Sequence, residues 1–356
     1  MFKYRMFKKS ILFVALLLII TLIVGCTQIQ SVKTQPDSPG SQNSKDNKWF
    51  VLRGDLHCHS SFSVDSNAPI ETVVSDSVKA GYDFISLTEH NTQEHLKYLK
   101  EEYSNDDLII IPGYEWTLKR VHMNMFGLYE FEEKLGLDTF EEINSYIDYI
   151  HELGSIVQIN HPNWKALYAQ FALSIPGDLM EVWNGPFGTD DKKTLKDWQN
   201  LLTEGKKIIA TAGRDEHENY LNNSPVNNVY AEEKTAENIF ENIKKGHLYI
   251  TAMKDCSDIW LSCGDAIMGD TVEYAKGSQI YLKIEKLPHN AKIKIYSNKG
   301  IEFEEIYDAS KNTAYEKEFL VEEDKSFYRV EVWSAAVSIP LGISNPIYIE
   351  NENQNE

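Results

Sequence analysis

Two histidines in the segment Asp55-Leu56-His57-Cys58-His59 have the spacing of a metal chelate, and the segment closes an apolar run that we expect to be a strand. Alternate side chains of a strand point to the same face, so Asp55, His57 and His59 share one face and Cys58 points away. Two imidazoles on one face can bind one metal ion, and Asp55 is placed to orient a ligand. A lone pair of this kind is common, so the hypothesis depends on further fragments.

Similar fragments recur along the chain at the ends of other predicted strands. They are Leu87-Thr88-Glu89-His90, Pro112-Gly113-Tyr114-Glu115 with His122 opening the next strand, Ile159-Asn160-His161-Pro162, Gly213-Arg214-Asp215-Glu216-His217, and Asp65 in a serine-rich loop. In a barrel of parallel strands these ends meet at one mouth, which would turn scattered fragments into one cluster of imidazoles and carboxylates. The sequence therefore predicts a metal site.

The elements that must position these fragments alternate between short apolar runs and amphipathic stretches from residue 49 to about 252. Strands are predicted at 50–57, 83–88, 108–114, 123–129, 155–160, 179–183, 207–212 and 247–252. Helices are predicted from Pro69 to Gly81, from Asp138 to Leu153, over 189–204, and from the cap Thr235 to Gly246. This alternation indicates an α/β fold with a parallel sheet or barrel.

The chain changes character after about residue 258. Alternating polar and apolar residues at 279–284, 291–296 and 327–333 replace the helical patterns and predict a small antiparallel β domain. We expect domains at 49–257 and 258–350, followed by a polar tail at 351–356.

Composition and charge exclude several classes of protein. The 356 residues are 42% hydrophobic, which is enough for a core and excludes global disorder. The net charge of -19 argues against binding a long nucleic acid through a broad basic face. Residues 1–25 hold four basic and no acidic residues, so the remainder carries 31 basic and 54 acidic residues, or -23.

The N-terminal segment is typical of an export signal. Lys3, Arg5, Lys8 and Lys9 precede the apolar run 11–24, which is short for a membrane span, and the run ends at Gly25-Cys26. This end resembles a bacterial lipobox, which implies a signal peptide at 1–25, lipidation of Cys26 and a flexible tether at 26–48. The alternative is an uncleaved membrane anchor. Both place the globular part on the extracytoplasmic face of a bacterial membrane, where a Cys256–Cys263 disulfide would be permitted.

The ordered fragments DLHCHS, TEH, PGYE, NHP and GRDEH resemble the PHP (polymerase and histidinol phosphatase) family of metal-dependent hydrolases. RGDLHCHSSFS, LTEHNT, HMNMFGL, INHP, EVWNG and the trailing β domain are similar to its carbaryl-hydrolase-like branch. The resemblance covers roughly 51–350 and implies a distorted (β/α)7 TIM-like barrel, the PHP fold, holding two to three divalent ions.

The resemblance also implies a ligand set, with every expected position filled by a ligating residue type. Three ions would be held in turn by His57, His59 and Asp215 with Glu115 as a bridge, by His122 and His161, and by Asp65, His90 and His217. Imidazoles with carboxylates suit Zn²⁺ or Mn²⁺, with Fe²⁺ as a further candidate. Arg214 stands where the family often has a small residue. It either binds an anionic group of the substrate or pairs with a surface acid.

The expected activity is hydrolysis of a small phosphorylated substrate by metal-activated water, without a nucleophilic serine or cysteine. Asp55 and Arg214 are the expected non-ligand participants. The alternatives are a carbamate-ester hydrolase, a 5′-3′ exonuclease or oligonucleotide phosphodiesterase acting on very short strands, and an extracytoplasmic binding protein without turnover.

Overall fold

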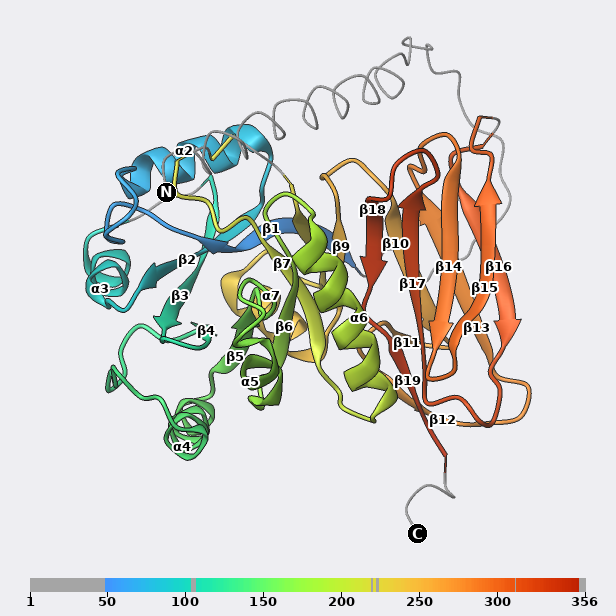
Figure 1. Ribbon diagram of the computed structural model, residues 1–356. Helices are drawn as coiled ribbons and strands as arrows, with labels where there is room; N and C mark the ends of the chain where they lie inside the picture. The colour runs from blue at the N-terminus through green and yellow to red at the C-terminus, as the bar shows by residue number, and fades with distance from the viewer. Residues whose placement is uncertain (1–48, 104–106, 219, 222–223, 311, 352–356) are drawn as a thin grey trace, which may run out of the picture. The chain divides into compact units, whose positions relative to one another are not determined.

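A computed structural model describes residues 49–103, 107–218, 220–221, 224–310 and 312–351 (Figure 1). The predicted signal peptide, the lipidation site Cys26, the tether and all but the first residue of the tail lie outside these ranges. Within the described ranges, every helix is too short or too polar to span a bilayer.

Seven strands form the barrel that the sequence predicts. They are β1 (Phe50–Cys58), β2 (Phe84–His90), β3 (Ile109–Thr117), β4 (His122–Phe126), β5 (Ile156–Asn160), β6 (Leu179–Asn184) and β7 (Ile209–Gly213). They pair in chain order, and the residues after β7 return to β1. There the Asp215 amide donates to the His57 carbonyl at 2.8 Å and the His59 amide donates to the Glu216 carbonyl at 3.1 Å. The ring is thereby closed, and the α/β barrel with an appended β domain is confirmed.

Strand β4 departs from the predicted all-parallel arrangement, because it runs antiparallel to both β3 and β5. Only residues 118–121 separate it from β3, and the Leu118 amide donates to the Val121 carbonyl at 3.1 Å. A link this short makes a hairpin, since a parallel crossover needs a dozen or more residues. The reversal brings the first residue of β4, His122, to the end of the barrel where the neighbouring strands finish.

The described helices are α2 (Ile70–Ala80), α3 (Glu94–Glu101), α4 (Phe140–Glu152), α5 (Ala169–Ser174), α6 (Thr189–Thr203) and α7 (Ala236–Lys245). Helix α7 has the predicted Thr235 cap and ends at Gly246 in the left-handed conformation. The sequence analysis placed the starts of α2 and α4 one and two residues too early. Pro69 caps α2 from outside the helix, and α4 begins after Thr139, whose hydroxyl accepts from the Glu142 amide in a capping box. Helices α3 and α5 were not predicted.

Apolar helix faces hold the barrel strands in place. Helices α4 and α6 share one buried cluster with β3–β7, in which Ile147 and Trp198 are fully enclosed. Helix α7 packs Ile239 and Ile243 against β1 and its neighbours, and α2 packs Val73 against the side of β2. The amphipathic stretches thus cover the barrel, and the strand ends are left to carry polar side chains.

Two further strands extend the sheet from β1. Strand β8 (Val226–Ala231) runs antiparallel to β1, and β9 (Leu248–Thr251) runs antiparallel to β8. Only β9 was predicted, because the two asparagines at the centre of β8 are typical of turns. Both are buried, and the Asn227 side chain bonds the backbone of Ala212 through its oxygen and its nitrogen. Tertiary contacts therefore overrode the local preference.

The C-terminal strands form the predicted β domain. They are β10 (Asp258–Cys263), β11 (Ala266–Ile267), β12 (Thr271–Glu273), β13 (Gln279–Glu285), β14 (Ala291–Ser297), β15 (Gly300–Tyr307), β16 (Tyr315–Leu320), β17 (Phe327–Ser334), β18 (Pro340–Ser344) and β19 (Ile347–Glu350).

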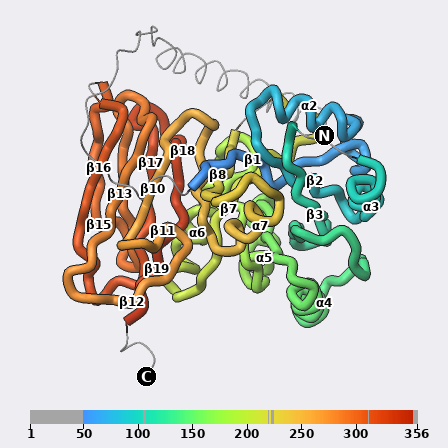
Figure 2. The backbone as a smooth tube through the Cα atoms, turned by 180° about the vertical axis from the view of Figure 1, so that it is seen from behind, coloured from blue at the N-terminus to red at the C-terminus, as the bar shows by residue number. Residues whose placement is uncertain are grey.

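The sheet β11-β10-β13-β16 packs against the sheet that contains β14, β17 and β19, with a shared apolar core (Figure 2). The pairing of β12 with β19 is the parallel exception. Strand β18 pairs with β9, so the second sheet continues into the barrel sheet. Cys58, Cys256 and Cys263 carry free thiols.

Candidate metal centre

The barrel mouth gathers all of the sequence-predicted ligands around one buried carboxylate. They are His57 and His59 of β1, Asp65 after β1, His90 of β2, Glu115 of β3, His122 of β4, His161 after β5, and Asp215 and His217 after β7. Three subsets place one ligand atom per residue within 4.8 Å of one another: His57, His59, Asp215; His57, Glu115, His161; and His59, His90, His217. These clusters are consistent with divalent metal ions.

The first subset matches the trio expected for one ion. Asp215 Oδ1 lies 3.4 Å from His57 Nε2 and 3.2 Å from His59 Nε2. Two atoms that ligate one ion at about 2.0–2.2 Å in tetrahedral geometry lie roughly 3.3–3.6 Å apart. The spacing of these atoms therefore fits a shared ion.

Glu115 occupies the centre of the cluster and faces both sides. Its Oε1 lies 3.5 Å from His57 Nε2, 3.2 Å from His122 Nδ1 and 3.7 Å from His161 Nε2. Its Oε2 lies 3.7 Å from His59 Nε2 and 2.5 Å from His90 Nδ1. A carboxylate with imidazoles beside each oxygen has the geometry of a bridge between two ions.

Asn160, at the end of β5, holds this carboxylate in place. Its side-chain amide donates to Glu115 Oε1 at 3.0 Å and to Asn124 Oδ1 at 2.7 Å. In the sequence, Asn160 stood out only as the neighbour of His161.

The third group forms a stack of imidazoles at the outer part of the cluster. The His59 ring lies 4.3 Å from the His90 ring and 4.2 Å from the His217 ring, centroid to centroid. Asp65 Oδ2 lies 3.6 Å from His90 Nε2, and its Oδ1 lies 3.4 Å from His217 Nε2. The predicted trio of Asp65, His90 and His217 is therefore assembled, with His59 beside it.

Unsatisfied buried atoms test whether these residues fit a metal. Among the described residues, His57 Nε2, His59 Nε2, His161 Nδ1 and His217 Nε2 are buried without a hydrogen-bond partner. Buried polar atoms without partners are costly and rare in folded proteins. These four imidazole nitrogens lie in one cluster beside two carboxylates, which is the pattern expected of ligand atoms.

Glu181 of β6 orients His57, a role that the sequence pattern did not reveal. Its Oε1 lies 2.9 Å from His57 Nδ1, and both side chains are fully buried. An ionised carboxylate only accepts hydrogen bonds, so Nδ1 carries a proton, and Nε2 is the nitrogen that is left to bind a metal once it is deprotonated. The available signal was a lone acid in the apolar strand LMEVWN, within the EVWNG fragment.

His59 is oriented through a serine relay from Glu89. The Ser63 hydroxyl donates to Glu89 Oε2 at 2.6 Å and lies 3.1 Å from His59 Nδ1. Because the hydroxyl proton is used on Glu89, its oxygen accepts from His59 Nδ1–H and leaves His59 Nε2 for a metal. Glu89 thus supports His59 through Ser63 and belongs to none of the three candidate ligand clusters.

The histidines and carboxylates of the cluster shift one another's pKa. Burial raises the pKa of Glu115 and of Asp215, but the neighbouring histidines, His57 foremost, hold both well below the usual range. Burial lowers the pKa of His57, but the adjacent Glu181, Asp215 and Glu115 raise it well above its usual value. At His59, burial lowers the pKa by more than Asp215 and Glu115 raise it, so its pKa is lowered. Both carboxylates are therefore ionised at neutral pH.

Arg214 and Asp55 lie behind the centre and not at its mouth. The Arg214 guanidinium is fully buried, with Nε 2.7 Å from Asp55 Oδ2 and the ring of Tyr82 4.6 Å away. The expectation that Arg214 contacts substrate is wrong, because its charge is neutralised inside the barrel wall, and the alternative of a surface pair is wrong for the same reason. Asp55 Oδ1 accepts from the amides of His57 and Arg214 at 3.1 and 3.0 Å, so it positions backbone instead of an imidazole ring.

The backbone at two candidate ligands is in the left-handed region, with φ of 30° at His161 and 49° at Asp215. Residues other than glycine rarely adopt this conformation, and such strain concentrates at functional sites. Gly213, the last residue of β7, is packed so closely that an added Cβ would overlap Glu181 Oε1 and the Cβ of His57. Only glycine fits beside the oriented imidazole.

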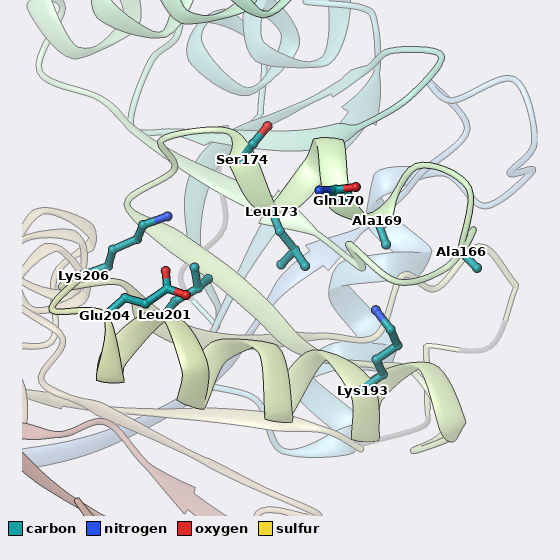
Figure 3. Close-up of a pocket in the computed structure, with 9 residues that line it drawn as sticks. All are labelled: Ala166, Ala169, Gln170, Leu173, Ser174, Lys193, Leu201, Glu204 and Lys206. Atoms are coloured by element: carbon teal, nitrogen blue, oxygen red, sulfur yellow. The ribbon is translucent and has the colours of Figure 1, made fainter. Parts of the chain in front are cut away.

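A separate groove of about 500 Å³ lies between α5 and α6 (Figure 3). Its lining includes Leu173, Ser174, Lys193 and Glu204 but none of the candidate ligands. It is therefore not part of the metal centre.

Comparison with known proteins identifies related folds. The family model for the PHP domain matches residues 55–251. A comparison with curated proteins found no match.

Three similar solved structures come from bacteria. One is a two-domain protein from Bacteroides vulgatus that contains a predicted PHP-like metal-dependent phosphoesterase, with 16% identity over 84% of this chain and 96% of that chain and a TM-score of 0.42. The second is a protein from Bifidobacterium adolescentis proposed to be a metal-dependent phosphoesterase, with 15% identity over 47% and 88% and a TM-score of 0.34. The third is an amidohydrolase from Chromobacterium violaceum, with 15% identity over 46% and 87% and a TM-score of 0.33.

Proposed function

This chain belongs to the PHP domain family, and we propose that it is a metal-dependent phosphoesterase that hydrolyses a small phosphorylated substrate. The observation that carries the proposal is the set of unsatisfied buried ligand atoms, His57 Nε2 and His59 Nε2 among them, beside the ionised carboxylates of Glu115 and Asp215. No described serine or cysteine is needed as a nucleophile, and Cys58 is buried with its thiol directed at the Ser86 carbonyl.

The side chains of the cluster would have the following roles. His57, His59 and Asp215 would hold one ion, Glu115 would bridge to a second held by His122 and His161, and Asp65, His90 and His217 would hold a third. When bound, divalent ions lower the pKa of water and neutralise charge on a phosphoryl group. Glu181 and Ser63 would each hold the Nδ1 proton of their histidine, so that Nε2 is the nitrogen that binds the metal, and Asn160 would fix the bridging carboxylate. The donor set of imidazole and carboxylate favours Zn²⁺ or Mn²⁺, with Fe²⁺ as a further candidate.

Purified protein assayed with a phosphomonoester, a phosphodiester and a carbamate ester tests this proposal. We expect turnover of a phosphate ester that stops in chelator and returns when Mn²⁺ or Zn²⁺ is added. His57→Ala should abolish turnover, whereas His289→Ala, an exposed histidine of the β domain that pairs with Asp308, should leave it unchanged. Full turnover in His57→Ala would refute the site, and cleavage of the carbamate alone would refute the substrate class.

We also propose that the enzyme is lipid-anchored through Cys26 on the extracytoplasmic face of a bacterial membrane. The basic start, the short apolar run and Gly25-Cys26 support this location. Wild-type protein should sediment with membranes and carry a lipidated N-terminus by mass spectrometry. Cys26→Ser should retain the uncleaved signal, whereas Cys58→Ser should process normally, and unlipidated wild-type protein would exclude the anchor.

A further inference from the structure

Trp164, in the loop after β5, lies directly beside the candidate ligands of the second ion. Its ring centroid is 5.0 Å from that of His122 and 5.6 Å from that of His161. A tight turn brings it there, since the Trp164 amide donates to the His161 carbonyl at 2.9 Å. The indole therefore borders the same space as the ligands.

The turn that carries Trp164 is anchored to α6. The buried Asn163 side chain donates to Thr194 Oγ1 at 3.1 Å and to Asp197 Oδ2 at 2.9 Å. A side chain on a turn fixed in this way is held in place before a ligand arrives, which reduces the entropic cost of binding.

Trp164 differs from other tryptophans of the protein in how its indole N–H is used. Trp116, Trp183, Trp198, Trp260 and Trp333 each donate this group to a protein oxygen, at 2.7–3.2 Å. Trp164 makes no side-chain hydrogen bond to any residue that the structure describes, and 38% of its surface is exposed. A large apolar ring is thus left partly open at the edge of a polar centre, where a ligand could contact it.

One face of the indole is in contact with a cationic side chain. The ammonium of the exposed Lys165 lies 3.7 Å from the ring centroid, a cation–π contact that is weak at an exposed site and easily exchanged. Planar aromatic groups bind such a face by offset stacking.

From these observations we propose that Trp164 forms the leaving-group subsite of the metal centre and that the preferred phosphate ester carries a planar aromatic leaving group. This inference rests on the proposed phosphoesterase function. The phosphoryl group would lie at the ions, and the aromatic ring would replace the Lys165 ammonium on the indole.

Binding of two non-hydrolysable probes to the Mn²⁺-loaded protein, measured by calorimetry, tests the subsite. Phenylphosphonate should bind more tightly than methylphosphonate to the wild type. Trp164→Ala should weaken phenylphosphonate about fivefold to tenfold and leave methylphosphonate within about twofold, while Trp164→Phe should restore most of the loss. Leu167→Ala, on the same loop and 83% exposed, is the matched control and should change neither affinity.

The remaining outcomes overturn the proposal in separate ways. An equal loss for both probes, or a fall in bound manganese in Trp164→Ala, would mean that the indole only supports the ligands. Equal affinity of the wild type for the two probes would refute the aromatic subsite while leaving phosphoesterase function intact. Failure to bind either probe together with absent phosphate-ester turnover would refute both.

Discussion

Replacing Glu181 by Gln is the sharpest test of how the fold prepares the metal centre. The change keeps the shape of the side chain but replaces one carboxylate oxygen with an amide that donates. In the wild type, Oε1 faces His57 Nδ1 at 2.9 Å, while Oε2 accepts from the His161 amide at 2.9 Å and from the Asn184 side chain at 3.0 Å. Because Oε2 has two donors to satisfy, the Gln oxygen should take that side and its NH₂ should face His57.

An NH₂ group at this position reverses the tautomer of the imidazole. His57 Nδ1 would have to accept, which moves the proton to Nε2, the atom expected to bind metal. Loss of such a supporting contact typically reduces metal affinity about 10- to 100-fold, which corresponds to about 1.4–2.8 kcal/mol. Both groups are fully buried, so water cannot substitute for the lost acceptor and we expect the upper part of this range.

The assay is competition with a coloured chelator for Zn²⁺ at several alkaline pH values, because the raised pKa of His57 lets protons compete for this imidazole above its ordinary value. Glu204→Gln, an exposed position after the end of α6, is the matched control and should keep wild-type affinity. Circular dichroism establishes that both variants are folded. Wild-type zinc affinity in folded Glu181→Gln would show that Glu181 does not set the His57 tautomer, and the assignment of Nε2 as a ligand prepared by this carboxylate would be wrong.

Three other properties of the centre can be tested by substitution and titration. Gly213→Ala should lower the free energy of unfolding in urea by about 1–3 kcal/mol and also reduce metal content, because the new Cβ overlaps His57; unchanged metal content would contradict this. Metal affinity should fall as pH is lowered, beginning above the ordinary imidazole pKa of 6.5. Burial lowers the pKa of His90 but Glu115 raises it by more, and a protonated imidazole cannot bind a metal. A chelator titration that shows no loss of affinity at lower pH would exclude this role of His90. Cys58→Ala should keep turnover and metal content, since burial raises the pKa of this thiol well above its usual value and it faces away from the ligands; abolished activity measured with phosphate ester would indicate a nucleophilic cysteine.

The polar strand ends are the part of the site that the sequence could predict. His57 and His59 alternate along one strand, and His90, Glu115 and His161 each close an apolar run. These are local signals, since the period of a strand decides which face a side chain takes and a barrel brings strand ends together. The residues that lie at the mouth could therefore be identified without coordinates.

The supporting residues depended on contacts between distant segments. Glu181 is 124 positions from the histidine that it orients, and Arg214 reaches Asp55 across 159 positions. A single acidic residue or arginine in the sequence does not indicate whether its side chain faces solvent or a buried partner. Its burial, and hence its role, was decided only when the elements packed.

By itself, the sequence determined the α/β barrel, the antiparallel β domain and the candidate ligands, because hydrophobic period and polar strand ends are properties of short segments. Only the tertiary structure decided that β4 is reversed, that β8 exists around two buried asparagines, that Arg214 is turned away from the mouth and that Trp164 borders it. The burial of the β8 asparagines and of Arg214 follows from partners far along the chain, where the free energy of burial and of satisfied hydrogen bonds exceeds any local preference.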